Sequence, residues 1–396
     1  MATLNAIVGA AADPRPLIAH VVYRFAVGGL ENGVVNLINH MPTERWRHVV
    51  LSLTEIDPGF ASRIQRTDVI CLALHKPPGQ GFRQYPALWR QFMQWRPAIV
   101  HTRNLAALEA QVPAWLAGVP GRVHGEHGRD IEDMHGTNPR HMMIRRVYRP
   151  FVQQYIALGQ ELLAYSREKI RVPATRVQAI YNGVDTARFA PLPVRADIPG
   201  SPFNDPALWL VGTVGRMQTI KAQPLLARAF VVALQRQPGM AKHLRLVMVG
   251  DGPLRADCEA ILQTAGVAHL AWMAGERSDV PDVMRGLNCF VLPSLAEGIS
   301  NTILEAMACA LPVLVTRVGA SAELVQDGGT GVVVPPGDVP ALAQGLLRLA
   351  RDPAAAAQMG RAGRQAVEQR YSLQAMVGAY ESVYRRVLAQ PGPGVS

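Results

Sequence analysis

Long hydrophobic runs are absent from this chain of 396 residues. No apolar stretch reaches the roughly 18 residues that a membrane-spanning helix needs, so we expect no transmembrane segment. The first residues, MATLNAIVGAAADPRPL, lack a basic stretch ahead of their apolar residues, which argues against a signal peptide. These absences predict a cytoplasmic protein.

Cysteine is scarce, and several common binding motifs are missing. The four cysteines, Cys71, Cys258, Cys289 and Cys309, are widely scattered and form no CxxC pair. This spacing argues against a zinc site and fits a reducing compartment. The sequence also lacks a D-x-D metal signature, a GxxxxGK[ST] phosphate loop and a GxGxxG after its first strand. A metal-dependent sugar transferase, a P-loop ATPase and a dinucleotide dehydrogenase are therefore disfavoured.

Acidic residues are fewer than basic ones. The chain has 30 Asp and Glu against 40 Lys and Arg, a net charge of +10, and 49% apolar residues. The positive surplus suits an anionic ligand, a membrane surface or nucleic acid. The apolar fraction is too high for a disordered chain, and the length is too great for one core, so we expect two domains.

Short apolar strands alternate with helical patterns in two series. The first series contains 18–25, 47–53, 98–103, 121–127 and 153–159, and the second contains 208–215, 244–252, 270–275, 289–294 and 311–319. Such alternation predicts right-handed crossovers and parallel sheets. We therefore expect an α/β protein of two Rossmann-like, doubly wound domains. Its active site should lie at the carboxyl ends of the strands, in the cleft between the domains.

A proline-rich segment separates the two series. Residues 191–206 hold five prolines and are predicted to be a linker. The N-terminal domain is then 1–190 and the C-terminal domain 207–375. We expect 376–390 to form a C-terminal helix that packs back on the first domain, and 391–396 to be a disordered tail.

Two cations follow the strand 208–215. Arg216 and Lys221 lie where diphosphate binds in doubly wound sheets, with Gly215 beside them. An arginine offers a fork to two phosphate oxygens and a lysine offers a point charge. Two plain surface cations are the alternative.

Two glutamates, Glu297 and Glu305, surround a predicted helix start. A separation of about 12 Å along a helix is too long for paired acid–base catalysis and suits an elongated ligand held at both ends. The alternative is an exposed loop carboxylate and a solvated helix carboxylate. The helix N-terminus offers backbone N–H groups to an anion or to sugar hydroxyls; its residues are Gly298, Ile299, Ser300 and Asn301.

Two glycine-containing turns carry weaker signals. Gly28 and Gly29, in the first strand-to-helix turn, either let backbone N–H groups approach a phosphate or form a plain tight turn. In the segment 250–253, Asp251 either caps a helix or, with Gly252, borders a bound ring.

Polar residues also end strands of the first series. In the segment 124–130, His127 is a candidate contact to the reacting sugar, and Glu126 or Asp130 is a candidate proton acceptor. A polar loop with satisfied histidines is the alternative. The further candidates on the acceptor side are Arg103, Asn104 and Arg129.

The segment 140–149 is predicted to be an amphipathic helix. Arg145, Arg146 and Arg149 share one of its faces. They suit an anionic membrane surface, or an ordinary solvated face.

Taken in order, these motifs resemble those of family-4 (group 1) retaining glycosyltransferases, which have the GT-B architecture. The resemblance covers nearly the whole chain. It is carried by GGLENGVVNLINHMP, IYNGVDTARF, LPSLAEGISNTILEAMACALPVLVT and VGASAELVQDGGTGVVVPPGD. The first half, with VVYRFAVGGLENG, VHTRNLAALEAQ and GEHGRD, is most similar to bacterial exopolysaccharide sugar transferases associated with exosortase (PEP-CTERM) systems.

The resemblance implies a role for several residues. Arg216 and Lys221 match the pair that neutralises the diphosphate, Glu305 the residue that binds the ribose, and Glu297 and His127 the contacts to the donor sugar. Gly28 and Gly29 match glycines near the phosphates. The family needs no metal or other cofactor and retains the anomeric configuration.

Three positions depart from the family pattern. Ile220 stands where an acidic residue often precedes the lysine, and Ala310 and Ala320 replace glycines. None removes a charged group that the chemistry needs, so we expect a competent enzyme. It would transfer a sugar from a nucleotide diphosphate donor to a glycan or lipid-linked acceptor in exopolysaccharide synthesis, with a peripheral contact to an anionic membrane. A nucleotide-sugar epimerase of the same architecture is the alternative, and a basic nucleic-acid-binding or scaffold protein ranks last.

Overall fold

The structure, a computed structural model, describes residues 13–77, 81–128, 133 and 136–390. The described chain forms two compact units. Unit 1 contains the residues up to Tyr181 together with those from Leu373 onward, and unit 2 contains Asn182–Ser372.

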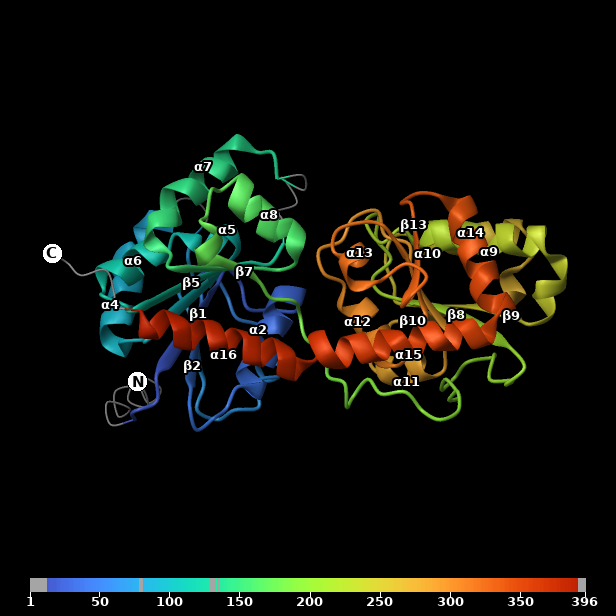
Figure 1. The fold of residues 1–396 in the computed structure, drawn as a ribbon, viewed down its shortest axis with the longest axis horizontal. Helices are drawn as coiled ribbons and strands as arrows, with labels where there is room; N and C mark the ends of the chain where they lie inside the picture. The colour runs from blue at the N-terminus through green and yellow to red at the C-terminus, as the bar shows by residue number, and fades with distance from the viewer. Residues whose placement is uncertain (1–12, 78–80, 129–132, 134–135, 391–396) are drawn as a thin grey trace. The chain divides into compact units, whose positions relative to one another are not determined.

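Unit 1 is built on seven parallel strands in the order β3-β2-β1-β4-β5-β6-β7 (Figure 1). The strands are β1 (Leu17–Val22), β2 (Arg47–Ser52), β3 (Ile70–Ala73), β4 (Ile99–Arg103), β5 (Gly121–Glu126), β6 (Gln154–Ala157) and β7 (Val177–Ala179). The helices are α2 (Gly29–His40), α3 (Pro58–Ala61), α4 (Tyr85–Trp95), α5 (Asn104–Leu108), α6 (Gln111–Leu116), α7 (Pro139–Tyr148), α8 (Gln160–Glu168) and α16 (Leu373–Ala389). Short 3-10 turns are η2 (Gly81–Gln84), η4 (Arg149–Phe151) and η5 (Ala174–Arg176). The strand order reverses between β1 and β4.

Unit 2 repeats the same plan with six parallel strands in the order β10-β9-β8-β11-β12-β13 (Figure 1). The strands are β8 (Trp209–Val214), β9 (Leu244–Val249), β10 (Ala271–Gly275), β11 (Cys289–Leu292), β12 (Val313–Thr316) and β13 (Gly331–Val334). The helices are α9 (Gln223–Arg236), α10 (Arg255–Thr264), α11 (Val280–Arg285), α12 (Asn301–Ala308), α13 (Ser321–Leu324), α14 (Val339–Arg351) and α15 (Pro353–Arg370), with 3-10 turns η6 (Pro238–Lys242) and η7 (Ala268–Leu270). Its strand order reverses between β8 and β11.

The predicted fold class, two doubly wound α/β domains, is confirmed. Three strands were not predicted from the sequence: β3, β7 and β13. Each lies at an edge of its sheet and has at most four residues, so its apolar run is too short to stand out.

The boundary between the units lies earlier than the expected 190, because the segment after Tyr181 is tied to unit 2. Arg285 donates to the carbonyls of Arg188 (2.6 Å) and Ala190 (3.1 Å). The proline-rich segment 191–206 is also part of unit 2, since Ile198 is fully buried and packs where a Cβ on Gly286 would stand. The prolines indicate irregular backbone in this segment. Because Ile198 packs against unit 2, the segment is not a free linker.

Helix α16 completes the core of unit 1. It begins at Leu373, three residues before the expected helix, and buries Tyr380, Tyr384 and Val387 against Ile18 of β1 and Ile99 of β4. The expected tail 391–396 lies outside the described residues.

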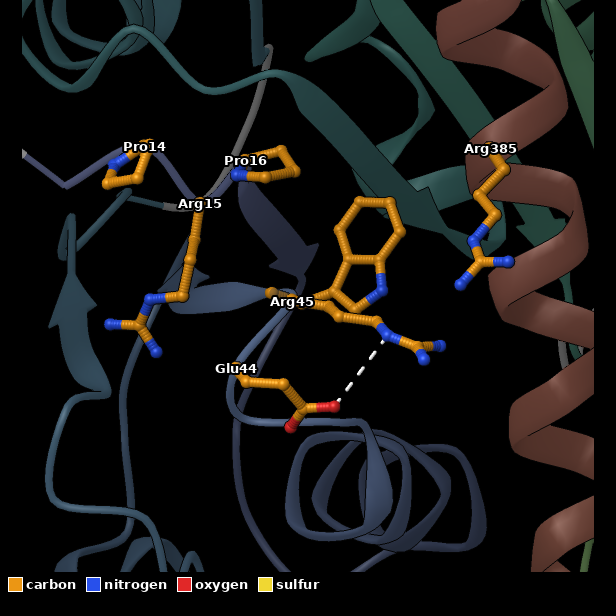
Figure 2. Close-up of a pocket in the computed structure, with 7 residues that line it drawn as sticks. Pro14, Arg15, Pro16, Glu44, Arg45 and Arg385 are labelled. Carbon is orange, nitrogen blue, oxygen red and sulfur yellow. Dashed lines mark ion pairs between the residues drawn. The ribbon is translucent and has the colours of Figure 1, made fainter.

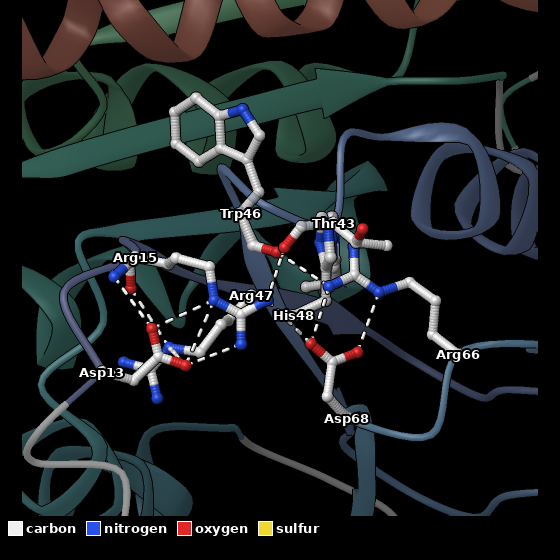
Figure 3. Close-up of polar contacts among 9 residues, drawn as sticks. Asp13, Arg15, Thr43, Trp46, Arg47, His48, Arg66 and Asp68 are labelled. Atoms are coloured by element: carbon white, nitrogen blue, oxygen red, sulfur yellow. Dashed lines mark hydrogen bonds and ion pairs between the residues drawn. The ribbon is translucent and has the colours of Figure 1, made fainter.

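Ion pairs lie at the amino ends of β1 and β2 in unit 1 (Figure 3). Arg15 pairs with Asp13 at 2.6 Å, and Arg66 pairs with Asp68 at 2.7 Å. Arg66 also donates to the carbonyl of Trp46 (2.8 Å). These contacts hold the segments that lead into β1 and β2.

A row of buried histidines crosses the face of the unit 1 sheet that α16 covers. His20 of β1 and His101 of β4 are partners in register, and the ring of His48 on β2, whose register partner is Ile18, stacks on that of His20 at 5.2 Å. Arg103 donates to Nδ1 of His20 (3.1 Å), so the other nitrogen of His20 carries the proton that it shares with His48 (3.0 Å). Burial, helped by the charge of Arg103, holds the pKa of His20 and His101 well below the usual value and lowers that of His48 to about 3. These rings are therefore neutral in the folded protein.

The histidine row predicts acid-labile packing of unit 1. The unfolded chain takes up protons below pH 6.5 while the folded rings do not, so stability present above pH 6.5 is lost as the pH falls toward 3. Below pH 6.5, each of these histidines lowers the free energy of unfolding by about 1.4 kcal/mol for every pH unit. Hydrogen exchange of β1 and β4, corrected for intrinsic rates, should show falling protection from pH 7.5 to 5.5, with a shallower fall in His48→Gln. Equal protection at both pH values would contradict this account.

Candidate functional site

The strand reversal of unit 2 brings two loops together at the carboxyl edge of its sheet. One loop follows β8 and the other follows β11, and the backbone N–H of Leu295 donates to the carbonyl of Ile220 (2.7 Å). In open α/β sheets, ligands bind at such a reversal. This position is therefore the candidate site of unit 2.

A lysine–glutamate pair lies between these loops. Nζ of Lys221 lies 2.6 Å from Oε1 of Glu297, and the Ser294 hydroxyl donates to the same oxygen at 2.6 Å. The Glu297 side chain is 7% exposed and the Lys221 side chain 28% exposed. The lysine thus keeps part of its donor capacity toward solvent while one of its N–H groups is taken by Glu297. Ser294, directly after β11, was missed, although its place at a strand end signalled it.

Arg216 supplies a second cation on the loop after β8. It is exposed, and its side chain makes no ion pair within the described ranges. Its backbone carbonyl accepts a hydrogen bond from the buried Gln223 (3.0 Å), which fixes the loop. The loop therefore carries two cations, of which only Lys221 has a carboxylate partner.

The loops after β8 and β9 touch backbone to backbone through glycines. A Cβ on Gly250 would lie 2.1 Å from the carbonyl oxygen of Gly215, and one on Gly252 would lie 2.5 Å from that of Met217. Gly215, Gly250 and Gly252 all have positive φ. Close packing of the two loops is a sufficient physical reason for Gly250 and Gly252, and the role of Gly252 beside a bound ring stays a prediction.

Asp251 does not cap a helix. The helix α10 begins at Arg255 with Leu254 at its N-cap position. The Asp251 carboxylate instead accepts from the N–H of Gly252 (2.6 Å) and pairs with Arg255 (3.3 Å). The capping interpretation was wrong because the chain makes a further turn before the helix starts.

The N-terminus of α12 is supported from two sides. The N–H of Ala320 donates to the carbonyl of Gly298 (3.1 Å), and a Cβ on Gly319 would lie 1.8 Å from the carbonyl oxygen of Glu297. The amide oxygen of Asn301 accepts from Asn182 (2.9 Å), a contribution that the sequence did not predict. Ser300 stands at the N-cap, but its hydroxyl contacts Thr302 (2.9 Å) and does not cap the helix. Ile299 is half-buried, and Gly298 faces open space.

Glu305 lies one turn further along α12. Burial raises the pKa of its carboxyl to about 7, against the opposing charge of Arg188. No side-chain hydrogen bond to Glu305 occurs within the described part of the chain. A desolvated carboxyl with free acceptor capacity suits the hydroxyls of a ligand.

The three departures from the family pattern are tolerated by the backbone. Ala310 adopts φ +57°, a left-handed conformation that costs about 1 kcal/mol in a non-glycine residue. Ala320 is buried, and Ile220 contributes its carbonyl to the contact with Leu295.

In unit 1, His127 and Asn104 are brought together. The N–H of His127 donates to Oδ1 of Asn104 (2.7 Å), and the ring folds over Gly125. Burial and the charge of Arg103 lower the pKa of His127 to about 3, so the ring is neutral, and its Nε2 has no hydrogen-bond partner among the described residues. The two residues lie at the carboxyl ends of β5 and β4.

Arg103 is a buried cation without a carboxylate partner in the part of the chain that is described. It is 2% exposed, and its guanidinium donates to His20 (3.1 Å) and approaches His101 (3.4 Å). The hydroxyl of Tyr384 and the charge of Glu31 also interact with this guanidinium. A buried guanidinium of this kind at a strand end is a candidate for anion binding.

Glu126 is poorly suited to accept a proton. Burial alone would raise its pKa, but Arg145 and His124 outweigh that effect and lower the pKa to about 2. Arg145 contacts both carboxylate oxygens, at 2.8 and 3.2 Å. The carboxylate is thus a buried ion-pair partner. The other candidates of this loop, Arg129 and Asp130, lie outside the described residues.

The arginines of α7 do not form a lipid-facing side. Arg145 is 4% exposed, Arg146 donates to the carbonyl of Lys169 (2.9 Å), and Arg149 donates to that of Arg171 (2.6 Å). The exposed residues are instead apolar: Met143 at 58% and Val147 at 57%. The membrane-facing interpretation was wrong because Glu126 and backbone carbonyls draw the arginines inward.

Gly28 is the N-cap of α2, with extended backbone at φ −168°. A Cβ there would lie 2.2 Å from Oε2 of Glu31, whereas one on Gly29 would meet open space. Burial raises the pKa of Glu31. Glu31 was not predicted, although acidic residues are common in a first helical turn.

Two other features of the described residues lie outside these groups. A hollow of about 350 Å³ at the amino ends of the unit 1 strands is lined by Arg15, Trp46 and Arg385 (Figure 2), at the edge opposite to the ligand edge of such sheets. No group of three or more metal-ligating side chains is found in the described ranges.

Comparison with known families adds to this geometry. Residues 209–352 match the family described as "Glycosyl transferases group 1", and residues 27–188 match "Glycosyltransferase Family 4". The chain belongs to these glycosyltransferases. The strand reversal of unit 2 falls within the matched residues, whereas β1, one of the two strands at the reversal of unit 1, precedes them.

Curated relatives of the glycosyltransferase include sugar transferases of bacterial envelopes. The chain is 27% identical over 276 residues to the Escherichia coli UDP-Gal:alpha-D-GlcNAc-diphosphoundecaprenol alpha-1,3-galactosyltransferase, covering 67% of this chain and 70% of that protein. It is 31% identical to the lipopolysaccharide core mannosyltransferase LpcC of Rhizobium leguminosarum, covering 55% of this chain and 61% of the relative. Beyond the Escherichia coli enzyme, the relatives are covered over 38–61% of their own length.

Solved structures share the fold of this glycosyltransferase. The Anabaena protein HepE in complex with UDP has a TM-score of 0.79 at 18% identity, covering 94% of this chain and 100% of that one. A glycosyltransferase from Rickettsia africae has a TM-score of 0.78 at 16% identity, covering 96% and 100%. This likeness confirms the GT-B fold.

Glu305 predicts a pH-dependent affinity for nucleotide. The carboxylate form accepts hydroxyl hydrogen bonds, so UDP binding should weaken as the pH falls below 7. Glu305→Gln should bind UDP about tenfold more weakly at pH 8, since a hydrogen bond to a charged group contributes roughly 1.5–3 kcal/mol. Isothermal titration calorimetry measures both effects, with Glu368→Gln on α15 as the control. Unchanged affinity in Glu305→Gln would count against this assignment.

Proposed function

We propose that this chain transfers a sugar from a nucleoside diphosphate donor to a glycan or lipid-linked acceptor, with retention of the anomeric configuration. The observation that carries the proposal is the lysine–glutamate pair at the strand reversal of unit 2, with Arg216 and Glu305 on the adjoining loop and helix. Cations, a hydroxyl acceptor and free helix N–H groups in one place fit a diphosphate, a ribose and a sugar.

The proposed mechanism requires little covalent chemistry from the protein. The bond between the anomeric carbon and the diphosphate oxygen breaks while the acceptor oxygen attacks from the same face. The acceptor proton leaves with the diphosphate oxygen. Lys221 and Arg216 stabilise the negative charge that develops on the leaving group, and Glu297 orients the donor sugar together with the N–H groups of α12. We assign no metal to this step, because the side chains supply the positive charge.

The acceptor assignment rests on unit 1 and on the relatives. The Escherichia coli relative is named for an undecaprenol diphosphate acceptor, and the second relative for lipopolysaccharide core synthesis. Both names support a lipid-linked glycan acceptor, and we place the reaction at the cytoplasmic face of a membrane as part of the proposal. No described helix has the length and hydropathy to cross a bilayer. We also propose a role in exopolysaccharide synthesis, because the first half of the chain resembles exosortase-associated transferases. His127 and Arg103 remain its candidate contacts to the reacting groups.

Turnover with UDP-, GDP- and ADP-sugars, in EDTA and with lipid-linked glycan acceptors, tests the proposal. We expect one donor to be consumed and the product linkage to keep the donor's anomeric configuration by NMR. Lys221→Ala should lower kcat by about 10²- to 10³-fold, the usual effect of removing one preorganised charge-stabilising donor.

The matched control is Lys242→Ala, which removes an exposed lysine of unit 2 on η6. Its turnover should equal that of the wild type. An inverted product would contradict retention, and activity lost in EDTA would contradict metal independence. A new nucleotide sugar formed from donor alone would identify an epimerase.

A further inference from the structure

Two buried imidazole nitrogens border one small space at the carboxyl ends of β4 and β5. Nε2 of His101 and Nε2 of His127 are both enclosed, and neither has a hydrogen-bond partner among the described residues. A Cβ on Gly125 would lie 3.2 Å from the first nitrogen and 2.4 Å from the second. Because glycine has no Cβ, nothing of Gly125 separates the two rings.

The proton of His101 sits on the nitrogen that borders this space. Arg103 directs an N–H at Nδ1 of His101 (3.4 Å), and the Tyr384 hydroxyl lies 2.7 Å from the same nitrogen. A guanidinium can only donate, and its positive charge disfavours a proton on the atom that it faces. Nδ1 is therefore the acceptor. Since the buried ring is neutral, its single N–H is at Nε2.

His127 offers the matching acceptor. Its ring is also neutral, so one of its nitrogens donates and the other accepts. Nε2 borders the space that the N–H of His101 enters, whereas Nδ1 is not enclosed by the protein. The backbone of His127 is fixed by its hydrogen bond to Asn104 (2.7 Å). With the opposite tautomer, two enclosed N–H groups would meet without an acceptor, which is unfavourable.

A metal ion is a poor occupant of this space. It would need a lone pair from each ring, and His101 has none on this side, because its lone pair is at Nδ1. The arrangement of donors instead fits a hydrogen bond from one histidine to the other, made directly or through one bridging water molecule.

We propose that His101 is a positioning residue that holds His127 as its Nδ1–H tautomer, through a hydrogen bond across Gly125. The inference rests on the proposed function, in which His127 contacts a reacting sugar. The accessible Nδ1–H then donates to a sugar oxygen, and no lone pair of the ring faces the substrate. His127 is thus a hydrogen-bond donor and does not accept a proton in the reaction. Tyr384 makes α16, from the far end of the sequence, part of this support.

Nitrogen-15 NMR of the histidine rings tests the proposal on the wild-type chain. Two-bond 1H–15N correlation spectra of protein labelled with 15N-histidine distinguish the two neutral tautomers. The signals of His127 are assigned by their loss in His127→Gln. At pH 7.5 we expect a single Nδ1–H tautomer for His127. An Nε2–H tautomer, or an exchanging mixture of the two, would overturn the proposal.

Two variants disrupt the contact in different ways. His101→Leu removes the donor, and Gly125→Ala places a methyl group where the two nitrogens approach. Both should release His127 into a mixture of tautomers. The matched control is His48→Gln, which changes a buried histidine of the same row that stacks on His20. It should leave the tautomer of His127 unchanged. A fixed Nδ1–H tautomer in both disrupting variants would contradict the role of His101.

Turnover separates positioning from nucleotide binding. Sugar transfer by His101→Leu and Gly125→Ala should fall about two- to tenfold in kcat, the usual effect of one neutral hydrogen bond. Their affinity for UDP should equal that of the wild type, because UDP is assigned to unit 2, and circular dichroism verifies their folding. Wild-type turnover in a variant with mixed tautomers would overturn the donor role of His127. A fixed tautomer in a wild-type chain that transfers no sugar would leave the positioning by His101 intact and remove the proposed function.

Discussion

The contact between Lys221 and Glu297 depends on a chain of backbone hydrogen bonds that joins four loops of unit 2. The loop after β8 is bonded to the loop after β9 through Met217 and to the loop after β11 through Ile220, and the loop after β11 is bonded to the loop after β12 through Gly298. A cation and a carboxylate are thereby held 2.6 Å apart at the edge of the sheet. Glycines at the loop contacts permit this packing, since a Cβ on Gly250 or Gly319 would overlap a carbonyl. The site is therefore a property of the loop network rather than of any single motif.

The sequence predicted the parts of this arrangement that strand ends determine. Arg216, Lys221 and Glu297 follow apolar strands directly, and the carboxyl ends of parallel strands meet at one edge, so their proximity follows from the fold class. Glu305 was predicted from its place on the same helix. Ser294 and Asn182 were missed, because a serine after a strand and an asparagine in a loop are common and carry little signal alone.

Long-range packing decided what the sequence could not predict. The helical spacing of Arg145 and Arg149 is the same whether the helix faces lipid or protein, and Glu126, nineteen residues before Arg145, determines the direction. The prolines of 191–206 indicate irregular backbone but not that Ile198 is buried in unit 2. The short edge strands β3, β7 and β13 have too few residues for a periodic pattern. In unit 1, the histidine row could not be predicted, because it depends on the register of His20 with His101 and on the stacking of His48 on His20.

A structure of the chain with bound UDP is the most direct measurement of the account. We expect diphosphate oxygens within hydrogen-bond distance of Nζ of Lys221 and of the Arg216 guanidinium, and a ribose hydroxyl that donates to Glu305. Nucleotide bound away from the loops after β8 and β11, for example in the hollow lined by Arg15 and Arg385, would contradict it.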